Sequence, residues 1–209
     1  MDTQTACLMV DRLACSRDDR LLFSNVSFSL SQGQMLLLEG RNGSGKTSLL
    51  RILCGFREAD EGAIYWDGKA IEESEYFSDM AYVGHAEGSK KELTVLENLK
   101  FALALNTPGH YSIPQALAKV ALTGYDDNLV QTLSAGQKRR LSLARLLITR
   151  NRLWILDEPF TSLDKQGIDL IEGLMVDHLR LGGMVLLTSH QDLCLEHIDL
   201  QRLHLDDYQ

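Results

Sequence analysis

The residues with the clearest chemical meaning form a glycine-rich stretch, residues 40–47, of sequence GRNGSGKT. An apolar run precedes it and a leucine-rich segment follows, so a strand, a loop and a helix are expected there. Backbone N–H groups of such a loop can surround phosphate oxygens, and the helix N-terminus adds positive charge. We expect Lys46 to reach the β- and γ-phosphates of ATP and Thr47 to ligate Mg²⁺. The residues expected to contact the nucleotide are Gly40, Arg41, Asn42, Gly43, Ser44, Gly45, Lys46, Thr47 and Ser48.

An acidic pair, Asp157 and Glu158, ends the apolar run 153–156. Ligands of open α/β sheets sit at the carboxyl ends of strands, which places this pair near the nucleotide. Asp157 is expected to hold Mg²⁺. Glu158 is expected to orient and polarise the attacking water, because phosphoryl transfer depends mainly on positioning and electrostatics. His190 follows another apolar run, 184–187, and is expected to contact the γ-phosphate.

A second short motif, LSAGQ at residues 133–137, precedes a segment whose apolar residues Leu141, Ala144 and Ile148 share one helical face. Such a motif suits one ATP held between two copies of the same surface. The sequence therefore favours an ATPase that forms a homodimer around ATP.

In these motifs the chain resembles the ATP-binding subunits of ABC transporters, over almost its full length. The LSAGQ segment is similar to the family's signature motif, with Ala135 where glycine is commonest. The resemblance implies a D-loop at Asp164 and a switch histidine at His190. It places the family's adenine-stacking aromatic near Arg17, whose guanidinium plane would have to stack instead. The signature residues implied to close over the partner's γ-phosphate are Leu133, Ser134, Ala135, Gly136 and Gln137.

One segment, residues 82–99, resembles a narrower group. Its sequence YVGHAEGSK places His85 where the family usually has glutamine, and this looks like the short ATP-binding subunit of the bacterial cytochrome c maturation system, the haem exporter. His85 can still hydrogen-bond near Mg²⁺ and water, and it titrates near neutral pH. The resemblance implies integral membrane partner subunits, a place on the cytoplasmic face of the inner membrane, and a role in haem handling. Apart from His85, nothing in the sequence offers a haem pocket, so we expect no direct contact with haem.

Alternating strand and helix patterns predict an α/β fold with a mainly parallel sheet and helices on both sides. We expect a P-loop NTPase of the ABC type, with an antiparallel β subdomain and a helical subdomain. The hairpin turn is expected at Asp67 and Gly68. Helices are expected over 94–105, which opens with capping-box spacing, and over 115–124. The whole chain, 1–209, is read as a single ATP-binding domain, with its core in 1–88 and 150–209 and its helical subdomain in 89–149.

Charge and composition limit the possible partners. The formal net charge of −8 argues against a protein that mainly grips nucleic acid. The basic residues 138–140, 145, 150 and 152 are read as a solvated helix side rather than a nucleic-acid face. No apolar run approaches the roughly twenty residues of a membrane-spanning helix, so any membrane link is expected to run through a partner.

Two other functions stay open. One is a soluble ABC-type ATPase of DNA repair or translation, although this sequence shows neither the coiled-coil insertion nor the second cassette typical of that class. The other is an ABC subunit serving a different cargo.

Overall fold

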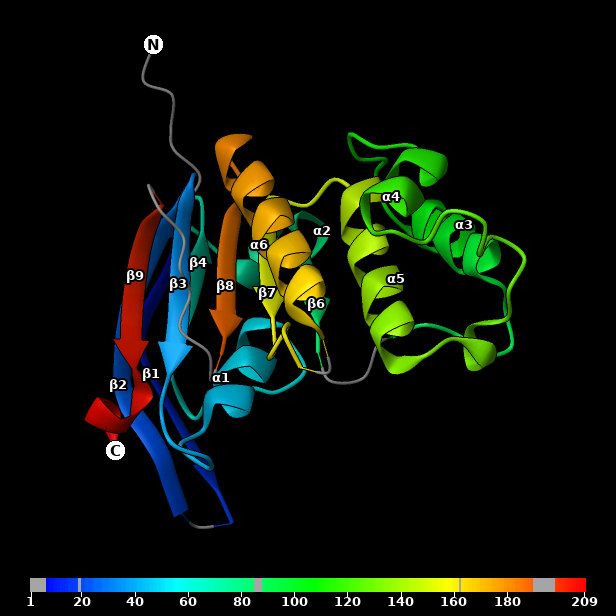
Figure 1. Ribbon diagram of the computed structural model, residues 1–209. Coiled ribbons are helices and arrows are strands. Elements are labelled where there is room, and N and C mark those ends of the chain that lie inside the picture. Colours follow the sequence, from blue (N-terminus) through cyan, green and yellow to red (C-terminus); the bar gives the residue numbers. More distant parts are fainter. Residues whose placement is uncertain (1–6, 19, 85–87, 162, 190–197) are drawn as a thin grey trace.

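The computed structural model describes residues 7–18, 20–84, 88–161, 163–189 and 198–209, which form two sheets and a group of helices (Figure 1). The larger sheet has the strand order β6-β7-β8-β3-β9, and every pair of neighbours in it is parallel. The predicted mainly parallel α/β core is therefore confirmed. Its strands are β3 (Gln34–Glu39), β6 (Met80–Val83), β7 (Leu153–Leu156), β8 (Met184–Thr188) and β9 (Asp199–His204).

This parallel sheet is buried on both faces. In β3, Met35 and Leu37 pack in one core with residues of the helices α5 and α6, whose bounds are Ala135–Ile148 and Lys165–Arg180. Leu36 and Leu38 point into a second core, with α1 (Lys46–Leu53) and the antiparallel sheet. Successive strand residues face opposite sides, so a strand covered on both faces must be apolar throughout. This explains the continuous apolar runs.

The smaller sheet is antiparallel, with the order β2-β1-β4-β5. Its last two strands form the hairpin predicted at Asp67 and Gly68. Tyr65 pairs with Ala70 across it, and both turn residues have positive φ, 50° and 79°, as a type I′ turn requires. The strands are β1 (Cys7–Arg17), β2 (Arg20–Ser31), β4 (Glu61–Trp66) and β5 (Lys69–Ala70).

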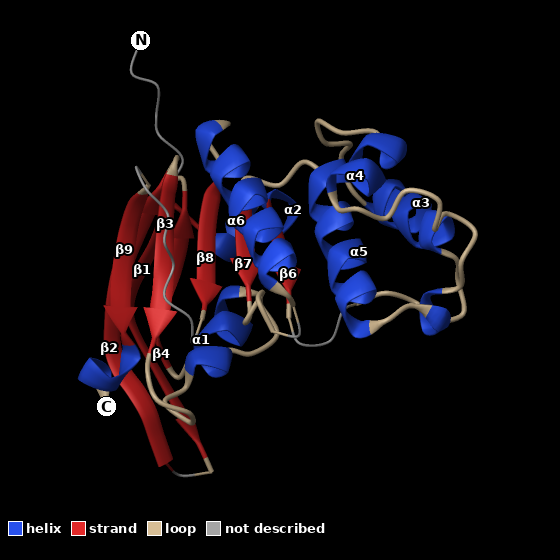
Figure 2. Cartoon of the chain, in the orientation of Figure 1, coloured by secondary structure: helices blue, strands red, loops and turns tan. Residues whose placement is uncertain are grey.

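Between β6 and β7 the described chain forms helices and no named strand, and these helices gather at one end of the molecule (Figure 2). The predicted helix after residue 94 is confirmed, including its capping box. Thr94 Oγ1 accepts a bond of 3.1 Å from the Glu97 N–H, and Glu97 Oε2 accepts one of 2.8 Å from the Thr94 N–H. The elements are α3 (Val95–Leu105), α4 (Ile113–Lys119), a 3₁₀ turn (Val130–Thr132) and α5.

The predicted extent of the next helix, 115–124, is wrong at its carboxyl end, because α4 stops at Lys119. Ala121 adopts φ 55°, and the Leu122 N–H donates back to the Leu117 carbonyl at 2.8 Å. This is a Schellman motif with alanine in the left-handed position that glycine usually takes. The helix thus ends before Gly124, which the sequence pattern favoured as its stop.

The carboxyl ends of β3, β8, β7 and β6 and the N-terminal ends of α1, α5 and α6 all face the lower side of the view in Figure 1. Helix α6 starts at Asp164, whose Oδ1 accepts a 2.8 Å bond from the Gly167 N–H. The fold therefore brings several helix N-termini and strand ends to one edge. The remaining short elements are α2 (Tyr76–Asp79) and two 3₁₀ turns, Ile71–Glu73 and Leu205–Tyr208.

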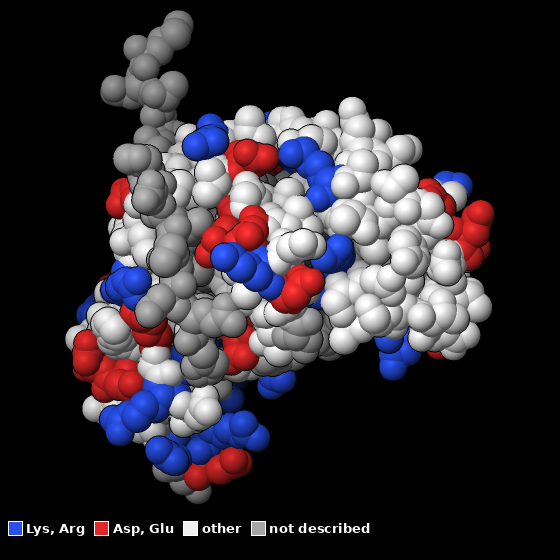
Figure 3. Space-filling model, viewed as in Figure 1, with Lys and Arg blue, Asp and Glu red and all other residues white. Residues whose placement is uncertain are grey.

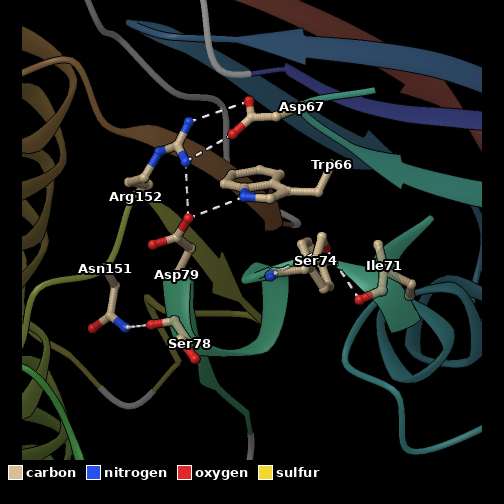
Figure 4. Close-up of polar contacts among 9 residues, drawn as sticks. Trp66, Asp67, Ile71, Ser74, Ser78, Asp79, Asn151 and Arg152 are labelled. Atoms are coloured by element: carbon tan, nitrogen blue, oxygen red, sulfur yellow. Dashed lines mark hydrogen bonds and ion pairs between the residues drawn. The ribbon is translucent and has the colours of Figure 1, made fainter. Parts of the chain in front are cut away.

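A junction around Arg152 joins the two sheets at the opposite ends of the strands (Figure 4). The guanidinium donates to both oxygens of Asp67, at 2.9 and 3.2 Å, and to Asp79 Oδ2 at 2.8 Å. It also lies over the ring of Trp66, whose Nε1 donates to Asp79 at 3.0 Å. The reading of Arg152 as a solvated cation is therefore wrong. Its side chain holds the hairpin turn and the end of α2 against the start of β7.

The surface seen in Figure 3 mixes acidic and basic side chains over the strand-rich part, while the part over α4 and α5 is largely uncharged. No helix within the described ranges combines the length and apolar character needed to cross a bilayer.

Candidate nucleotide-binding site

The glycine-rich loop connects β3 to α1, as predicted. Lys46 starts α1 and is only 8% exposed. Its ammonium group donates to the carbonyls of Gly40 at 2.6 Å and Arg41 at 3.2 Å, so the cation lies inside the curve of the loop. A buried cation held by a loop of this shape is suited to a phosphate chain.

Two glycines allow the loop to close. Gly40 has φ 146°, and a Cβ there would lie 2.7 Å from the Ser44 Oγ. Gly45 has φ 105°, and its Cβ would lie 3.0 Å from the ring of Phe23. A side chain at either position would clash and would need a conformation that L-residues rarely adopt. The Ser44 Oγ is itself buried without a hydrogen-bond partner among the described residues, which leaves a hydroxyl donor for a ligand.

The N-terminus of α1 adds the expected positive end. Gly45 provides no side-chain cap, and the first turn contains no acidic residue. Its first N–H groups are therefore available to an anion, and the helix dipole favours one. Thr47 is exposed and Ser48 half-buried at this end. On the loop, Arg41 and Asn42 are exposed, and the Arg41 N–H donates to Asp206 at 3.0 Å.

Asp157 lies at the end of β7 and is 2% exposed. Its Oδ1 accepts a 2.8 Å bond from the hydroxyl of Thr188, and the Tyr82 hydroxyl lies 3.5 Å from Oδ2. Burial and the Asp157 charge raise the pKa of Tyr82 to about 12, so this hydroxyl keeps its proton. Both neighbours of the carboxylate are thus neutral donors, which leaves its negative charge available to a cation.

Glu158 follows with φ 48°, a left-handed conformation that is unusual for a glutamate. Its N–H donates to Thr188 Oγ1 at 2.9 Å. Its Oε2 lies 3.4 Å from the Thr161 hydroxyl. The end of β7 therefore carries one buried carboxylate, Asp157, and one half-buried carboxylate, Glu158.

The LSAGQ segment starts α5. Ser134 is the N-cap: its hydroxyl accepts a 3.2 Å bond from the Gln137 N–H, and Gln137 Oε1 accepts a 2.8 Å bond from the Ser134 N–H. This is a capping box, a spacing in S-A-G-Q that the sequence analysis overlooked. Leu133 is buried as an anchor, whereas Ser134 and Ala135 are exposed at the positive end of the helix.

Two further residues of the predicted site, Arg17 and Asp164, are exposed. Arg17 ends β1 with a side chain 69% exposed, and it pairs with Asp18 at 3.4 Å. Asp164 is exposed and lies 4.0 Å from the guanidinium of Arg140. His85 and His190 fall outside the described residues, so their predicted roles stay predictions.

One residue was misread from the sequence. Arg139 belongs to the basic run that was expected to face solvent, but it is 7% exposed, and its guanidinium donates to four backbone carbonyls at the ends of β6 and β7. A cation on an amphipathic helix gives no local signal for this. It is the functional candidate that sequence reasoning missed.

Comparison with known proteins agrees with this geometry. The family model described as ABC transporter matches residues 23–161. The chain is 45% identical to the cytochrome c biogenesis ATP-binding export protein CcmA of Photobacterium profundum, over 95% of this chain and 99% of that one. It is 46% identical to the protein of the same name from Vibrio cholerae, over 96% and 99%. An ABC transporter ATP-binding protein from Pyrococcus furiosus superposes with a TM-score of 0.83 at 22% identity, covering 97% and 98% of the two chains, which supports the fold alone.

Proposed function

This chain belongs to the ABC transporter family, and within it to the cytochrome c biogenesis ATP-binding export proteins, and we propose that its ATP hydrolysis powers haem handling in cytochrome c maturation. It is the ATP-binding subunit of such a transporter, an ATPase.

The observation that carries the proposal is the convergence of the P-loop and the acidic strand end. Thr188 pairs with Leu38 in β3, two residues before the loop, and its hydroxyl bonds Asp157 in β7. Three adjacent parallel strands thus deliver the P-loop, Thr188 and the acidic pair to the same edge. Ligands of such sheets bind at this edge.

The roles follow from this placement. Lys46 and the N-terminus of α1 hold the phosphates, and the buried Ser44 hydroxyl adds a donor. Glu158 orients and polarises the attacking water. Hydrolysis then depends on how accurately these groups are held, since phosphoryl transfer needs little covalent work from the protein. His190 at the γ-phosphate, and His85 beside the water, complete the proposed catalytic set.

The donor set also fits Mg²⁺. Within the described ranges, no group of three or more His, Cys, Asp or Glu side chains is placed to hold a metal ion. Thr47 and Asp157 supply one hydroxyl and one carboxylate, and Mg²⁺ commonly completes such a sparse set with phosphate oxygens and waters. When bound, Mg²⁺ neutralises charge on the phosphate oxygens.

A second copy of the chain completes the site. Ser134 and Ala135 are exposed at the positive end of α5, and nothing in their own protomer's P-loop is bonded to them among the described contacts. Residues 133–137 of one copy close over the γ-phosphate held by the other, with Asp164 at the same seam. Arg17 lies at the adenine in place of an aromatic residue.

The membrane partner docks on the helical subdomain, residues 89–149, at the surface around Phe101 and Leu105 of α3. A cleft of about 210 Å³ lies between β6, α3 and α5. Phe101 and Leu105 on its rim are 46% and 69% exposed, and Lys90 lies over the Phe101 ring. Exposed apolar side chains beside a cleft mark an interaction surface. An integral membrane subunit that covers them would hold this chain at the cytoplasmic face of the inner membrane.

The test is complementation of a strain that lacks this protein. The wild-type chain should restore holo-cytochrome c and co-purify with integral membrane proteins from solubilised membranes. Lys46→Ala should lose ATP binding and holo-cytochrome c, while Lys69→Ala, an exposed change on β5, serves as the matched control. Normal holo-cytochrome c in the deletion strain would point to another cargo. Absence of membrane partners would point instead to a soluble ATPase.

A further inference from the structure

Arg139 lies in the second turn of α5, two residues after the signature segment 133–137, and is 7% exposed. Its guanidinium donates hydrogen bonds to backbone carbonyls at the ends of two strands. Nη1 donates to Gly84 at 2.8 Å, Nε to Pro159 at 3.1 Å, and Nη2 to Asp157 at 3.2 Å and Glu158 at 3.0 Å. One side chain therefore binds three consecutive carbonyls after β7 and the carbonyl that follows β6.

This arrangement uses features that only arginine offers. A buried charge is costly unless hydrogen bonds satisfy it. The planar guanidinium has five N–H donors in a fixed fork, whereas a lysine ammonium has three on a flexible stem. A lysine at position 139 would keep the charge but could not span the same four carbonyls.

The carbonyls belong to a strained segment. Glu158 has φ 48°, and such a conformation persists only where the surroundings hold it. Its N–H is held by Thr188 Oγ1 at 2.9 Å and its carbonyl by Arg139 at 3.0 Å. The carbonyls before and after it are also bound to Arg139. Arg139 and Thr188 together fix the peptide groups on both sides of Glu158.

We propose that Arg139 is a positioning residue for ATP hydrolysis, which holds the backbone of Glu158 so that its carboxylate is presented to the attacking water. The inference rests on the proposed function and deepens it. Because Arg139 is part of α5, it also joins the signature helix to the water-orienting loop of the same protomer. A displacement of α5 against the sheet therefore acts directly on Glu158.

The experiment compares Arg139→Lys, Arg139→Met and Lys138→Met in the purified membrane complex. Lys138 is the matched control, since it is the preceding cation on the same helix and its side chain makes no hydrogen bond or ion pair with the residues that the structure describes. Steady-state hydrolysis gives kcat and KM, and a fluorescent ATP analogue gives Kd and binding stoichiometry.

For Arg139→Lys we expect kcat to fall at least tenfold while the nucleotide Kd and stoichiometry stay within twofold of wild type. Lys138→Met should stay within twofold in all values. A merely structural role would instead reduce stoichiometry and thermal stability with kcat per binding site unchanged, and this would overturn the proposal. If Arg139→Met does not fold, Arg139→Lys decides alone.

A double variant tests the route through Glu158. In a Glu158→Gln background, adding Arg139→Lys should lower the residual hydrolysis less than twofold, because both changes act on the same carboxylate. A full further tenfold loss would contradict positioning through Glu158. If the wild-type complex hydrolyses no ATP, the proposed function fails; if it does and Arg139→Lys matches its kcat, only this inference fails.

Discussion

Thr188 donates a 2.8 Å hydrogen bond from its hydroxyl to the carboxylate of Asp157, and both side chains are buried, at 0% and 2% exposure. They stand at the ends of the adjacent parallel strands β8 and β7. The same hydroxyl accepts the N–H of Glu158 at 2.9 Å. One small side chain thus sets the orientation of the proposed metal-binding carboxylate and of the proposed catalytic residue.

Replacing Thr188 with valine keeps the shape and removes the hydroxyl. A buried carboxylate then loses a donor and a buried N–H loses an acceptor, so we expect the free energy of unfolding to fall by about 2 kcal/mol. ATP turnover should fall at least tenfold. Urea denaturation and steady-state hydrolysis check these values. Thr188→Ser, which retains the hydroxyl, should stay close to wild type, and equal losses in both variants would assign the effect to packing.

Glu158→Gln should bind ATP and hydrolyse it only at a low residual rate. The amide keeps the shape and the backbone contacts but loses the charge that polarises water. We expect the variant to form an ATP-locked homodimer, detected by size-exclusion chromatography with light scattering. Glu61→Gln, an exposed change on β4, is the control. A Glu158→Gln variant that stays monomeric with ATP bound would refute the role given to this residue.

Arg152→Met should weaken the fold and spare the chemistry. The substitution leaves Asp67 and Asp79 without their shared cation beside Trp66. Because the Arg152 side chain is 32% exposed, solvent screens part of the loss, and we expect about 1–2 kcal/mol of destabilisation by urea denaturation. The kcat for ATP should not change, since the junction lies away from the nucleotide edge. Arg180→Met, at the exposed end of α6, should change neither quantity.

His178 should make the free energy of unfolding depend on pH. The centroid of its ring lies 3.9 Å from that of the stacked Trp154 ring. Burial lowers the pKa of His178 to about 4, although hydrogen bonds to the backbone of Met184 and Arg152 oppose this shift. The nearby His110 also lowers it. The unfolded chain takes up this proton below about pH 6.5, but the native state does so only near pH 4. The free energy of unfolding should therefore fall as the pH drops through this window, by about 3 kcal/mol at most.

His178→Phe tests this directly, because phenylalanine keeps the stacked ring and does not titrate. Unfolding free energies measured by urea at several pH values between about 7 and 4 should show a shallower slope for the variant than for wild type. A slope that is unchanged by the substitution would show that His178 does not cause the pH dependence and that other titrating groups do.

Some of the site was predictable because its chemistry fixes residue type and spacing over a short stretch. The P-loop needs Gly40, Gly45 and Lys46 within seven residues, between a strand and a helix that the sequence pattern also shows. Arg139 could not be found in this way. Its acceptors lie 18 to 55 residues away in the chain, and only the folded sheet brings them to α5. The run KRR reads the same whether its middle residue is buried or solvated.

The end of α4 shows a different limit. A glycine at the left-handed position is the usual sequence signal for a helix stop, and Gly124 stands at the predicted end of this helix. The chain instead places Ala121 at φ 55° and accepts the conformational cost, because Leu122 is buried at 0% exposure just beyond. The burial of Leu122 outweighs the preference for glycine at the left-handed position. The local sequence pattern does not show this burial, so it could not predict where the helix ends.

Ala121→Gly should therefore stabilise the protein. The left-handed conformation costs an L-residue about 1–2 kcal/mol, and glycine avoids this while giving back part of it as chain entropy in the unfolded state. Since Ala121 is exposed and loses no packing, we expect a net gain of about 0.5–1 kcal/mol in urea denaturation. Ala118→Gly, an exposed change three residues earlier inside α4, should destabilise by about 1 kcal/mol. If both substitutions destabilise alike, Ala121 does not hold the strained position, and the helix must end for another reason.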